Sequence, residues 1–359
     1  MISRKILVIH PLTHSTKIAV FNNANLIFLN NIKHTGQELA KFKKVADQTE
    51  YRAKLVLREL RDDDIDFNLI EAVVARGGLM KPVKSGVYAI NDIMIADLRS
   101  GVMGEHAANL GGLVAHEVAK EFPNAKAYIA DPVVVDELDD IARASGHPEF
   151  ERKSVFHALN HKVVGRTHAN SNNQKYEDLN LIIVHVGSGG VSIAAHRKGR
   201  VVDVNQAFDG CGPFALERSG SLPSGDLVRA CFSGKYTQDE LISMITAEGG
   251  LKAYLGTKNL HEIERRIHKG DDDARFYLDA MAYQFAKEIG GLYTVFEGIP
   301  DGIIMIGDIF QSEIFTGMLT KRIEKLGKIV IYPGVNDLDA LAMNGNMILN
   351  GEIPVFEYK

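Results

Sequence analysis

Two segments of the sequence resemble each other, and this similarity constrains the fold more than any other feature. The segment ILVIHPLTHSTKIAV (6–20) aligns without gaps to LIIVHVGSGGVSIAA (181–195), and His10 then falls on His185. In each copy an apolar run is followed by a tight turn and a second apolar run, which is typical of a β-hairpin. Two copies at matching positions in the two halves indicate a duplicated domain. Chance similarity of two ordinary hairpins is the alternative, because only three of the fifteen aligned positions are identical.

The rest of the chain alternates short apolar runs with amphipathic stretches, which is typical of an α/β fold with mixed sheets. A length of 359 residues suits two domains. The expected strands are 5–10, 17–21, 72–75, 127–131, 181–186, 191–195, 302–307 and 328–333. The polar, turn-rich segment 170–178 is the expected domain boundary.

Composition excludes several classes of protein. Lys and Arg number 41 against 46 Asp and Glu, giving a net charge of −5, and no long basic run suggests nucleic acid as a partner. The two cysteines form no metal-binding or disulfide pattern, and a reducing cytoplasm is the expected compartment. No apolar stretch approaches the roughly 20 residues of a membrane span.

The turns of the two repeated hairpins are candidate phosphate-binding loops. Converging backbone N–H groups can hold phosphate oxygens, and glycine allows their close approach. The residues expected to contact nucleotide phosphates are His10, Thr13, Ser15, Thr16 and Lys17 in the first turn, and His185, Gly187, Ser188, Gly189 and Gly190 in the second. Each turn alone is better explained as a plain hairpin, but together they favour a nucleotide cleft. Because neither a Walker A loop nor a dinucleotide-binding glycine motif occurs, this arrangement points to the actin-like ATPase superfamily.

Longer segments extend this interpretation. RGGLMKPV (76–83), ADPVVVDELDDIAR (130–143), ERKSVFHALNHK (151–162) and GPFALERSGSLPSGDL (212–227) resemble butyrate kinases, the short-chain branch of the acetate kinase family. The resemblance runs from about residue 5 to residue 350. It implies two actin-like (ribonuclease H-like) domains, 1–170 and 175–335, separated by a cleft, with helix 337–350 packing back on the first. It also implies reversible transfer of phosphate from ATP, with Mg²⁺, to a small carboxylate, and a homodimer or larger assembly.

The resemblance also assigns roles to individual residues. Arg76 is a candidate for binding the substrate carboxylate, because a guanidinium matches a carboxylate in two hydrogen bonds. His157 resembles the histidine that contacts the transferring phosphoryl group, and Arg218 is placed to neutralise its oxygens. The other expected site residues are Asp131 and Asp337 as Mg²⁺ ligands, Asp131 also as a catalytic carboxylate, and Gly307 and Asp308 in the loop near the adenosine. Taken singly, these residues also have purely structural explanations: a turn cap, a helix histidine with internal hydrogen-bond partners, and surface ion pairs.

Departures from the family pattern concentrate in the nucleotide motifs. The first loop lacks the usual glycine, Ser188 interrupts a run of glycines, Asp308 replaces a glycine, and the acidic C-terminal turn keeps only Asp337. A second hypothesis follows: a catalytically weak or inactive kinase-fold protein that acts as a small-acid sensor or as a partner subunit.

Overall fold

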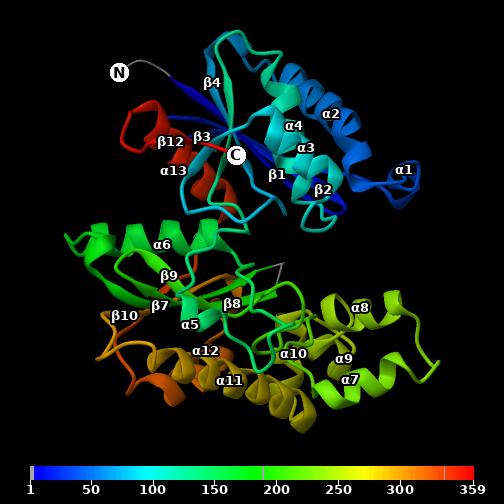
Figure 1. The fold of residues 1–359 in the computed structure, drawn as a ribbon, viewed down its shortest axis with the longest axis vertical. Helices are drawn as coiled ribbons and strands as arrows, with labels where there is room; N and C mark the ends of the chain where they lie inside the picture. Colours follow the sequence, from blue (N-terminus) through cyan, green and yellow to red (C-terminus); the bar gives the residue numbers. More distant parts are fainter. Residues whose placement is uncertain (1–3, 188–189, 335) are drawn as a thin grey trace. The chain divides into compact units, whose positions relative to one another are not determined.

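The computed structural model describes residues 4–187, 190–334 and 336–359. These residues form two compact units (Figure 1). The first contains the chain up to residue 135, residues 158–160 and residues 336–359, and the second contains residues 136–157 and 161–334. Within the described residues, no helix is both long enough and apolar enough to cross a bilayer.

The division of the chain differs from the expected boundary at 170–178. Residues 136–157 and most of helix α6 (Ala158–Ser171) belong to the second unit. Val164 and Ala169 of this helix are buried in one cluster with strand residues of the second sheet. Gly165 permits close packing, because a Cβ at this position would lie 2.6 Å from the ring of Tyr176. The polar segment is therefore a connection inside the second unit, held by a buried tyrosine.

The first unit is built on a mixed seven-stranded sheet in the order β12-β5-β6-β4-β1-β2-β3. Its first three strands form an antiparallel meander, and β4 and β6 run parallel to β1. The bounds are β1 (Lys5–Leu12), β2 (Ser15–Asn22), β3 (Asn25–Lys33), β4 (Ile70–Arg76), β5 (Val87–Ala89), β6 (Lys126–Ala130) and β12 (Val355–Glu357).

The second unit is built on a mixed five-stranded sheet in the order β11-β10-β7-β8-β9. It again starts with an antiparallel meander, which is followed by two strands parallel to the first. The bounds are β7 (Asn180–Gly187), β8 (Gly190–Arg197), β9 (Arg200–Val204), β10 (Gly302–Ile306) and β11 (Ile329–Tyr332). The two mixed sheets with a common strand order confirm the predicted fold class.

The first two strands of the two meanders match residue for residue at an offset of 175. Strands β1 and β7 begin and end at equivalent positions, as do β2 and β8. A register shift between Val20 and Phe21 recurs between Ala195 and His196, and it skips Ile27 in one copy and Val202 in the other. Since a β-bulge is a specific local feature of a strand pair, its recurrence supports duplication over chance similarity.

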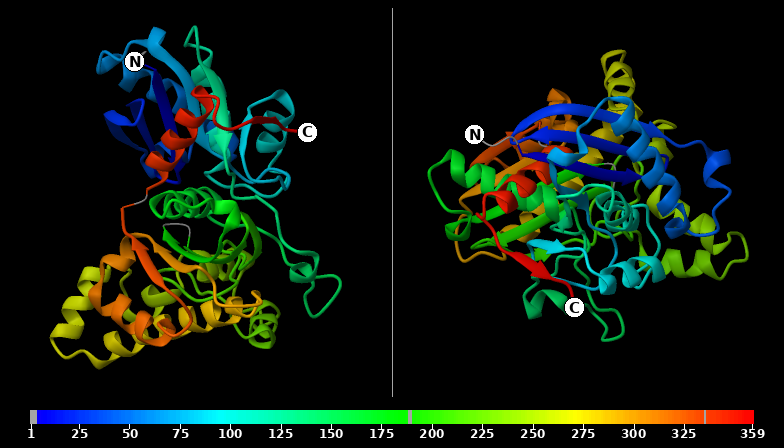
Figure 2. Two further views of the ribbon diagram at one scale, coloured as in Figure 1. Left: turned by 90° about the vertical axis from the view of Figure 1, so that its left-hand side faces the viewer. Right: turned by 90° about the horizontal axis from the view of Figure 1, so that it is seen from above.

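Helices cover both sheets. In the first unit α2 (Thr49–Asp62) and α4 (Asn109–Ala119) pack together, and apolar side chains of both join the core over β1 and β4. Helix α13 (Asp337–Leu349) lies against β1 and β4 (Figure 2). Gly345 allows this approach, because a Cβ there would lie 2.8 Å from Ile6.

In the second unit the long helix α11 (Asp272–Tyr293) forms the centre of the main core together with α12 (Glu313–Ile323). The remaining helices are short. They are α1 (Gly36–Leu39), α3 (Asp92–Ser100), α5 (Asp140–Arg143), α7 (Ser224–Cys231), α8 (Gln238–Thr246), α9 (Gly250–Leu255) and α10 (Leu260–His268), with 3₁₀ turns at Val45–Gln48, Phe67–Leu69, Tyr176–Asp178 and Asp308–Gln311.

Candidate active site

Three of the predicted site residues meet at one end of the first sheet. His10 lies in β1, Arg76 ends the neighbouring parallel strand β4, and Asp337 is the first residue of α13. Arg76 Nη1 lies 3.0 Å from Asp337 Oδ2 and 3.2 Å from His10 Nε2, and His10 Nδ1 lies 3.2 Å from the same carboxylate oxygen. The structure thus joins an arginine, a histidine and a carboxylate that are far apart in the sequence.

The protonation of His10 follows from these contacts. A guanidinium only donates hydrogen bonds, so Nε2 of His10 accepts and Nδ1–H donates to Asp337. Burial lowers the pKa of His10 to about 4, and the nearby Arg76 acts in the same direction. His10 is therefore a neutral ring at physiological pH, and Arg76 supplies the positive charge of this group.

Asp131 follows the next strand, β6, which pairs with β4 so that Ala130 lies beside Arg76. Its backbone is left-handed, with φ of 36°, and its side chain is buried. Oδ1 accepts a hydrogen bond of 2.8 Å from the N–H of Gly86, and the N–H of Asp131 donates to the carbonyl of Gly86. An aspartate tolerates this conformation better than most residues, and here it fixes a carboxylate at the strand end.

Arg52 holds the turn between β1 and β2 through hydrogen bonds. The sequence analysis did not identify this residue. Its guanidinium donates to the carbonyls of Leu12, Thr13 and Ser15 at 2.8 to 3.0 Å. It also donates to Thr16 Oγ1, at 3.1 Å. The sequence did contain a signal that Arg52 is buried, because Arg52 lies on the same side of α2 as the buried residues Val56 and Leu60.

This arrangement separates the polar residues of the turn. Thr13 is exposed at the tip and Lys17 is half-buried, whereas Ser15 and Thr16 are buried. The hydroxyl of Thr16 also bonds Nε2 of His34 at 2.9 Å. The structure therefore engages Thr16 with internal partners and leaves Thr13 at the surface of the turn.

A pocket of about 310 Å³ in the second unit contains several predicted nucleotide residues. Gly187, Gly190, Arg218 and Asp308 line it, together with Val186, Ala215, Leu216, Glu217, Lys258 and Ile309. Ser188 and Gly189 lie outside the described residues. Sequence reasoning did not identify Lys258, which pairs with Glu217 at 2.5 Å.

Glycine is required at two positions around this pocket. Gly190 has φ of 105°, and a Cβ there would lie 2.5 Å from Cδ of Arg218. Gly307 has φ of 121°, and a Cβ there would lie 2.1 Å from the carbonyl oxygen of Val186. Both positions need a left-handed backbone and close packing, so larger residues would distort the pocket wall.

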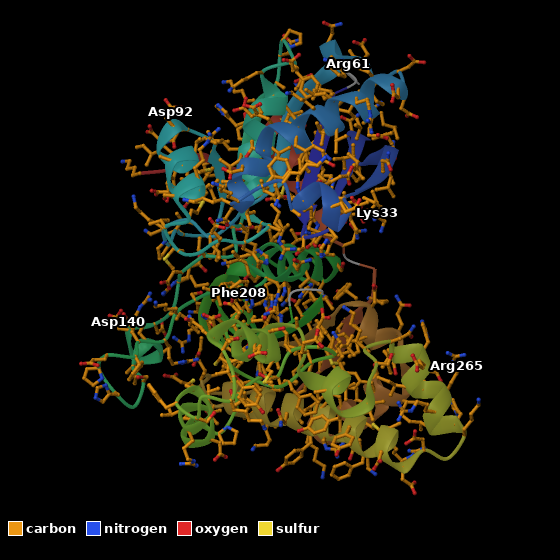
Figure 3. All side chains as sticks on the ribbon, turned by 90° about the vertical axis from the view of Figure 1, so that its right-hand side faces the viewer. Lys33, Arg61, Asp92, Asp140, Phe208 and Arg265 are labelled. Carbon is orange, nitrogen blue, oxygen red and sulfur yellow. The ribbon has the colours of Figure 1, made fainter. Side chains whose placement is uncertain are left out.

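Arg218 supplies one of the two positive charges in the lining of the pocket, beside Lys258. Nη1 donates to the carbonyl of Phe208 at 2.8 Å, and the guanidinium lies over the ring of this phenylalanine, which Figure 3 labels. Among the described residues, its buried Nε has no hydrogen-bond partner. Burial lowers the pKa of Arg218. A half-buried guanidinium with unused hydrogen-bonding capacity is suited to an anion such as phosphate.

His157 and His185 lie together in the second unit. His157 is the N-cap of α6, and its ring centroid lies 4.3 Å from that of His185 near the end of β7. The ring of His185 in turn lies against Gly187, a residue of the pocket wall. The ring of His185 thus lies between His157, the histidine predicted to contact the phosphoryl group, and Gly187 of the predicted nucleotide loop.

Within the residues that the structure describes, no group of three or more His, Cys, Asp or Glu is arranged to hold a metal ion. Asp131 and Asp337 each offer a carboxylate from the first unit. Mg²⁺ typically uses only one or two protein carboxylates, with substrate phosphates and water as its other ligands. The chemistry of these two hard oxygen donors suits Mg²⁺, and their role as its ligands stays a prediction.

Comparison with known proteins identifies relatives of the whole chain. The model of the acetokinase family matches residues 146–330. Two proteins of Clostridium acetobutylicum, butyrate kinase 2 and butyrate kinase 1, are 47% and 44% identical over 355 residues, which are 99% of this chain and 99% of each relative.

Solved structures show the same fold at low identity. The acetate kinase of Porphyromonas gingivalis has a TM-score of 0.77 at 17% identity and covers 97% of this chain and 100% of its own. The acetate kinase of Entamoeba histolytica has a TM-score of 0.75 at 15% identity, with 96% and 99% covered. The family model, the full-length relatives and the paired sheets agree, and the chain belongs to the acetokinase family.

Proposed function

We propose that this protein is an ATP-dependent butyrate kinase that phosphorylates butyrate or a branched relative reversibly. The observation that carries the proposal is the identity of 47% and 44% to two butyrate kinases over 99% of the chain. The alternative of an inactive sensor rested on departures in the nucleotide motifs. Relatives of such high identity that are named as kinases support activity.

The carboxylate substrate is bound by Arg76 in this proposal. The ion pair of its guanidinium with the carboxylate of Asp337, at 3.0 Å, supports this role. A short-chain acid is ionised at neutral pH, so its oxygen can attack phosphorus without a general base. The attack forms a new P–O bond at the γ-phosphorus, the bond to the bridging oxygen breaks, and ADP leaves.

The nucleotide is bound by the pocket of the second unit. Gly187 and Gly190 allow close approach of phosphate to the backbone, and Arg218 neutralises negative charge on the phosphoryl oxygens. Positioning and charge neutralisation are the main requirements of phosphoryl transfer. Asp131 and Asp337 would hold Mg²⁺, which supplies further neutralisation of the phosphates when it is bound.

The predicted partners are then a small carboxylate and a nucleotide. Both cysteines are free and exposed, which fits the reducing cytoplasm expected from the sequence. The homodimer or larger assembly implied by the resemblance stays a prediction.

A hydroxamate assay for acyl phosphate tests the proposed function. With Mg-ATP and linear or branched acids of two to six carbons, we expect the highest kcat/KM with butyrate or a four- to five-carbon branched acid. Titration calorimetry with Mg-ATP should show binding at millimolar nucleotide. Absence of both acyl phosphate and nucleotide binding would instead support the inactive sensor.

A further inference from the structure

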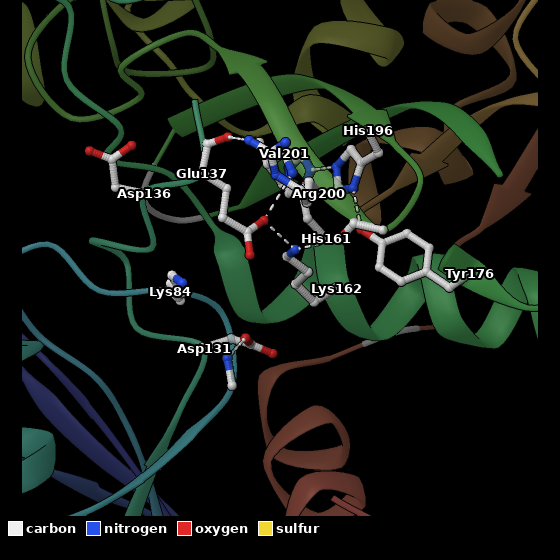
Figure 4. Close-up of polar contacts among 12 residues, drawn as sticks. Lys84, Asp131, Asp136, Glu137, His161, Lys162, Tyr176, His196, Arg200 and Val201 are labelled. Atoms are coloured by element: carbon white, nitrogen blue, oxygen red, sulfur yellow. Dashed lines mark hydrogen bonds and ion pairs between the residues drawn. The ribbon is translucent and has the colours of Figure 1, made fainter. Parts of the chain in front are cut away.

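A chain of buried polar side chains runs through the second unit and ends at His157. Tyr176 Oη lies 2.5 Å from His196 Nδ1, and His196 Nε2 lies 3.1 Å from His161 Nδ1. His161 Nε2 lies 2.8 Å from Ser192 Oγ, which lies 2.8 Å from His157 Nδ1. Figure 4 shows the end of this chain formed by His161, His196 and Tyr176. We call these five residues the relay.

The relay is shielded from water. Tyr176 and His157 are 4% and 5% exposed, and the three residues between them are fully buried. Burial holds the pKa of His161 and of His196 well below the ordinary value, so both rings are neutral. The ammonium of Lys162 further lowers the pKa of His196 and pairs with Glu137 at 2.6 Å.

Neutral rings give the relay a direction. A neutral imidazole has one donor and one acceptor nitrogen, so each hydrogen bond fixes the next one. Among the O–H and N–H groups of the relay, the phenol of Tyr176 is the most acidic. It is therefore the donor to Nδ1 of His196. His196 then donates from Nε2 to His161, and His161 donates from Nε2 to the oxygen of Ser192.

The last step sets the state of the terminal histidine. Since the Ser192 oxygen already accepts from His161, its hydroxyl hydrogen is available to donate to Nδ1 of His157. A neutral His157 then carries its proton on Nε2. In the reverse direction every bond would invert, and Nε2 of His157 would carry a lone pair instead.

We propose that Tyr176 is a positioning residue that, through the relay, holds His157 as the Nε2–H tautomer and so makes it a hydrogen-bond donor to the transferring phosphoryl group. This inference rests on the proposed function, because it concerns the same transfer. His157 lies against His185, whose ring lies against Gly187 of the nucleotide pocket.

The tautomer matters because phosphoryl oxygens only accept hydrogen bonds. The Nε2–H form stabilises charge that develops on them, whereas a lone pair at Nε2 would repel it. Removal of a group that orients a functional histidine through its second nitrogen typically changes activity by about 10- to 100-fold, as it does for the hydrogen-bond partners of metal-bound histidines. The relay should therefore act on the rate of transfer more than on substrate binding.

Tyr176→Phe tests the relay, because it removes one hydroxyl and keeps the ring. We expect kcat to fall about tenfold, while KM for ATP and for the acid changes less than about twofold. Tyr332→Phe is a matched control, because Tyr332 also bonds a histidine Nδ1 of α6, that of His168, at 3.1 Å. The control should keep kcat within about twofold.

A double-mutant cycle separates the relay from general destabilisation. Ser192→Ala cuts the final link, so we expect Tyr176→Phe to have little further effect in its presence. In the same cycle Tyr332→Phe should combine additively with Ser192→Ala. Additive effects of Tyr176→Phe and Ser192→Ala on kcat would overturn the proposal, as would an unchanged kcat in Tyr176→Phe.

Imidazole ¹⁵N chemical shifts give a readout that needs no turnover. In the ligand-free protein we expect His157 to be protonated at Nε2, and in Tyr176→Phe to be a mixture of tautomers. If Tyr176→Phe does not fold, Ser192→Ala should give the same mixture. A wild-type His157 protonated at Nδ1 overturns the relay even if the enzyme is active, whereas an inactive protein with the Nε2–H form contradicts only the proposed function.

Discussion

The side chains of Arg76 and Asp337 form an ion pair with 3.0 Å between Nη1 and Oδ2, although 261 residues separate them in the chain. The pair exists because α13 packs on β1 and β4 and brings its first residue to the end of β4. The guanidinium predicted to bind the substrate carboxylate therefore already contacts a carboxylate of the protein.

Asp337→Asn should increase the affinity for butyrate at least about threefold when it is measured by calorimetry without Mg²⁺. The neutral amide competes less strongly than a carboxylate for Arg76. Asp339→Asn is the matched control, because Asp339 lies in the same helical turn and bonds Asn336 instead. Weaker butyrate binding in Asp337→Asn would contradict this competition.

Arg76→Ala should lower kcat/KM for the acid at least about 100-fold, because the two-bond contact with the carboxylate is lost. The dissociation constant of ATP, measured by calorimetry, should change less than about twofold. Arg99→Ala, at an exposed arginine of the same unit, should leave both values unchanged. Full activity of Arg76→Ala would remove this residue from the carboxylate site.

Gly190→Ala should abolish measurable nucleotide binding. The added Cβ would both strain a left-handed backbone and displace Arg218 from the pocket wall. Gly234→Ala separates these effects, because Gly234 also has a positive φ, of 70°, but has open space around it. It should lose only about 1 kcal/mol of stability, as measured by urea unfolding, and bind nucleotide normally.

Arg52→Met should lower the free energy of unfolding by about 3 kcal/mol, because several carbonyls of the β1–β2 turn lose their donor. Arg58→Met, at an exposed position of the same helix, should change it by less than about 0.5 kcal/mol. Equal stability of the two variants in urea unfolding would show that Arg52 does not hold the turn.

The protein should lose stability as the pH falls from about 6.5 to about 4. Burial lowers the pKa of His10 and of His34 to about 4, while the unfolded chain keeps values near 6.5. The unfolded state thus binds more protons in this window, and each histidine costs up to about 3 kcal/mol at its lower end. These two groups contribute no pH dependence above the window.

Urea unfolding at several pH values measures this effect. His34→Gln should reduce the slope by about one proton, whereas His147→Gln, at an exposed position, should leave it unchanged. An unchanged slope in His34→Gln would contradict the assignment.

Local pattern was sufficient to predict the core of both sheets. The two hairpins were located because two apolar runs and a tight turn are contiguous in sequence. The helix expected at 337–350 begins at Asp337 and ends one residue earlier than expected, at Leu349. The third strands of the meanders, β3 and β9, were missed. β3 is mostly exposed and its apolar residues do not alternate with polar ones, and β9 is only five residues long.

Contacts between distant residues were not predictable in the same way. Arg52 contacts the β1–β2 turn across nearly 40 residues, and the relay joins three segments of the second unit through side chains. Each histidine of the relay looks like an ordinary apolar-face histidine in isolation. Lys258 likewise reaches the pocket only because the chain after α9 returns to Glu217.

The β1–β2 and β7–β8 hairpins have equal lengths, and both meanders have a bulge at the same position, so the two hairpins share one hydrogen-bond register. A gene in which codons 5–22 and 180–197 are exchanged would encode a chain of unchanged length. Each strand of the two hairpins would still begin and end at the same residue numbers. Such a transposition would leave the sheets with their bonding pattern and would move Ser192 and His196 into the other half of the molecule.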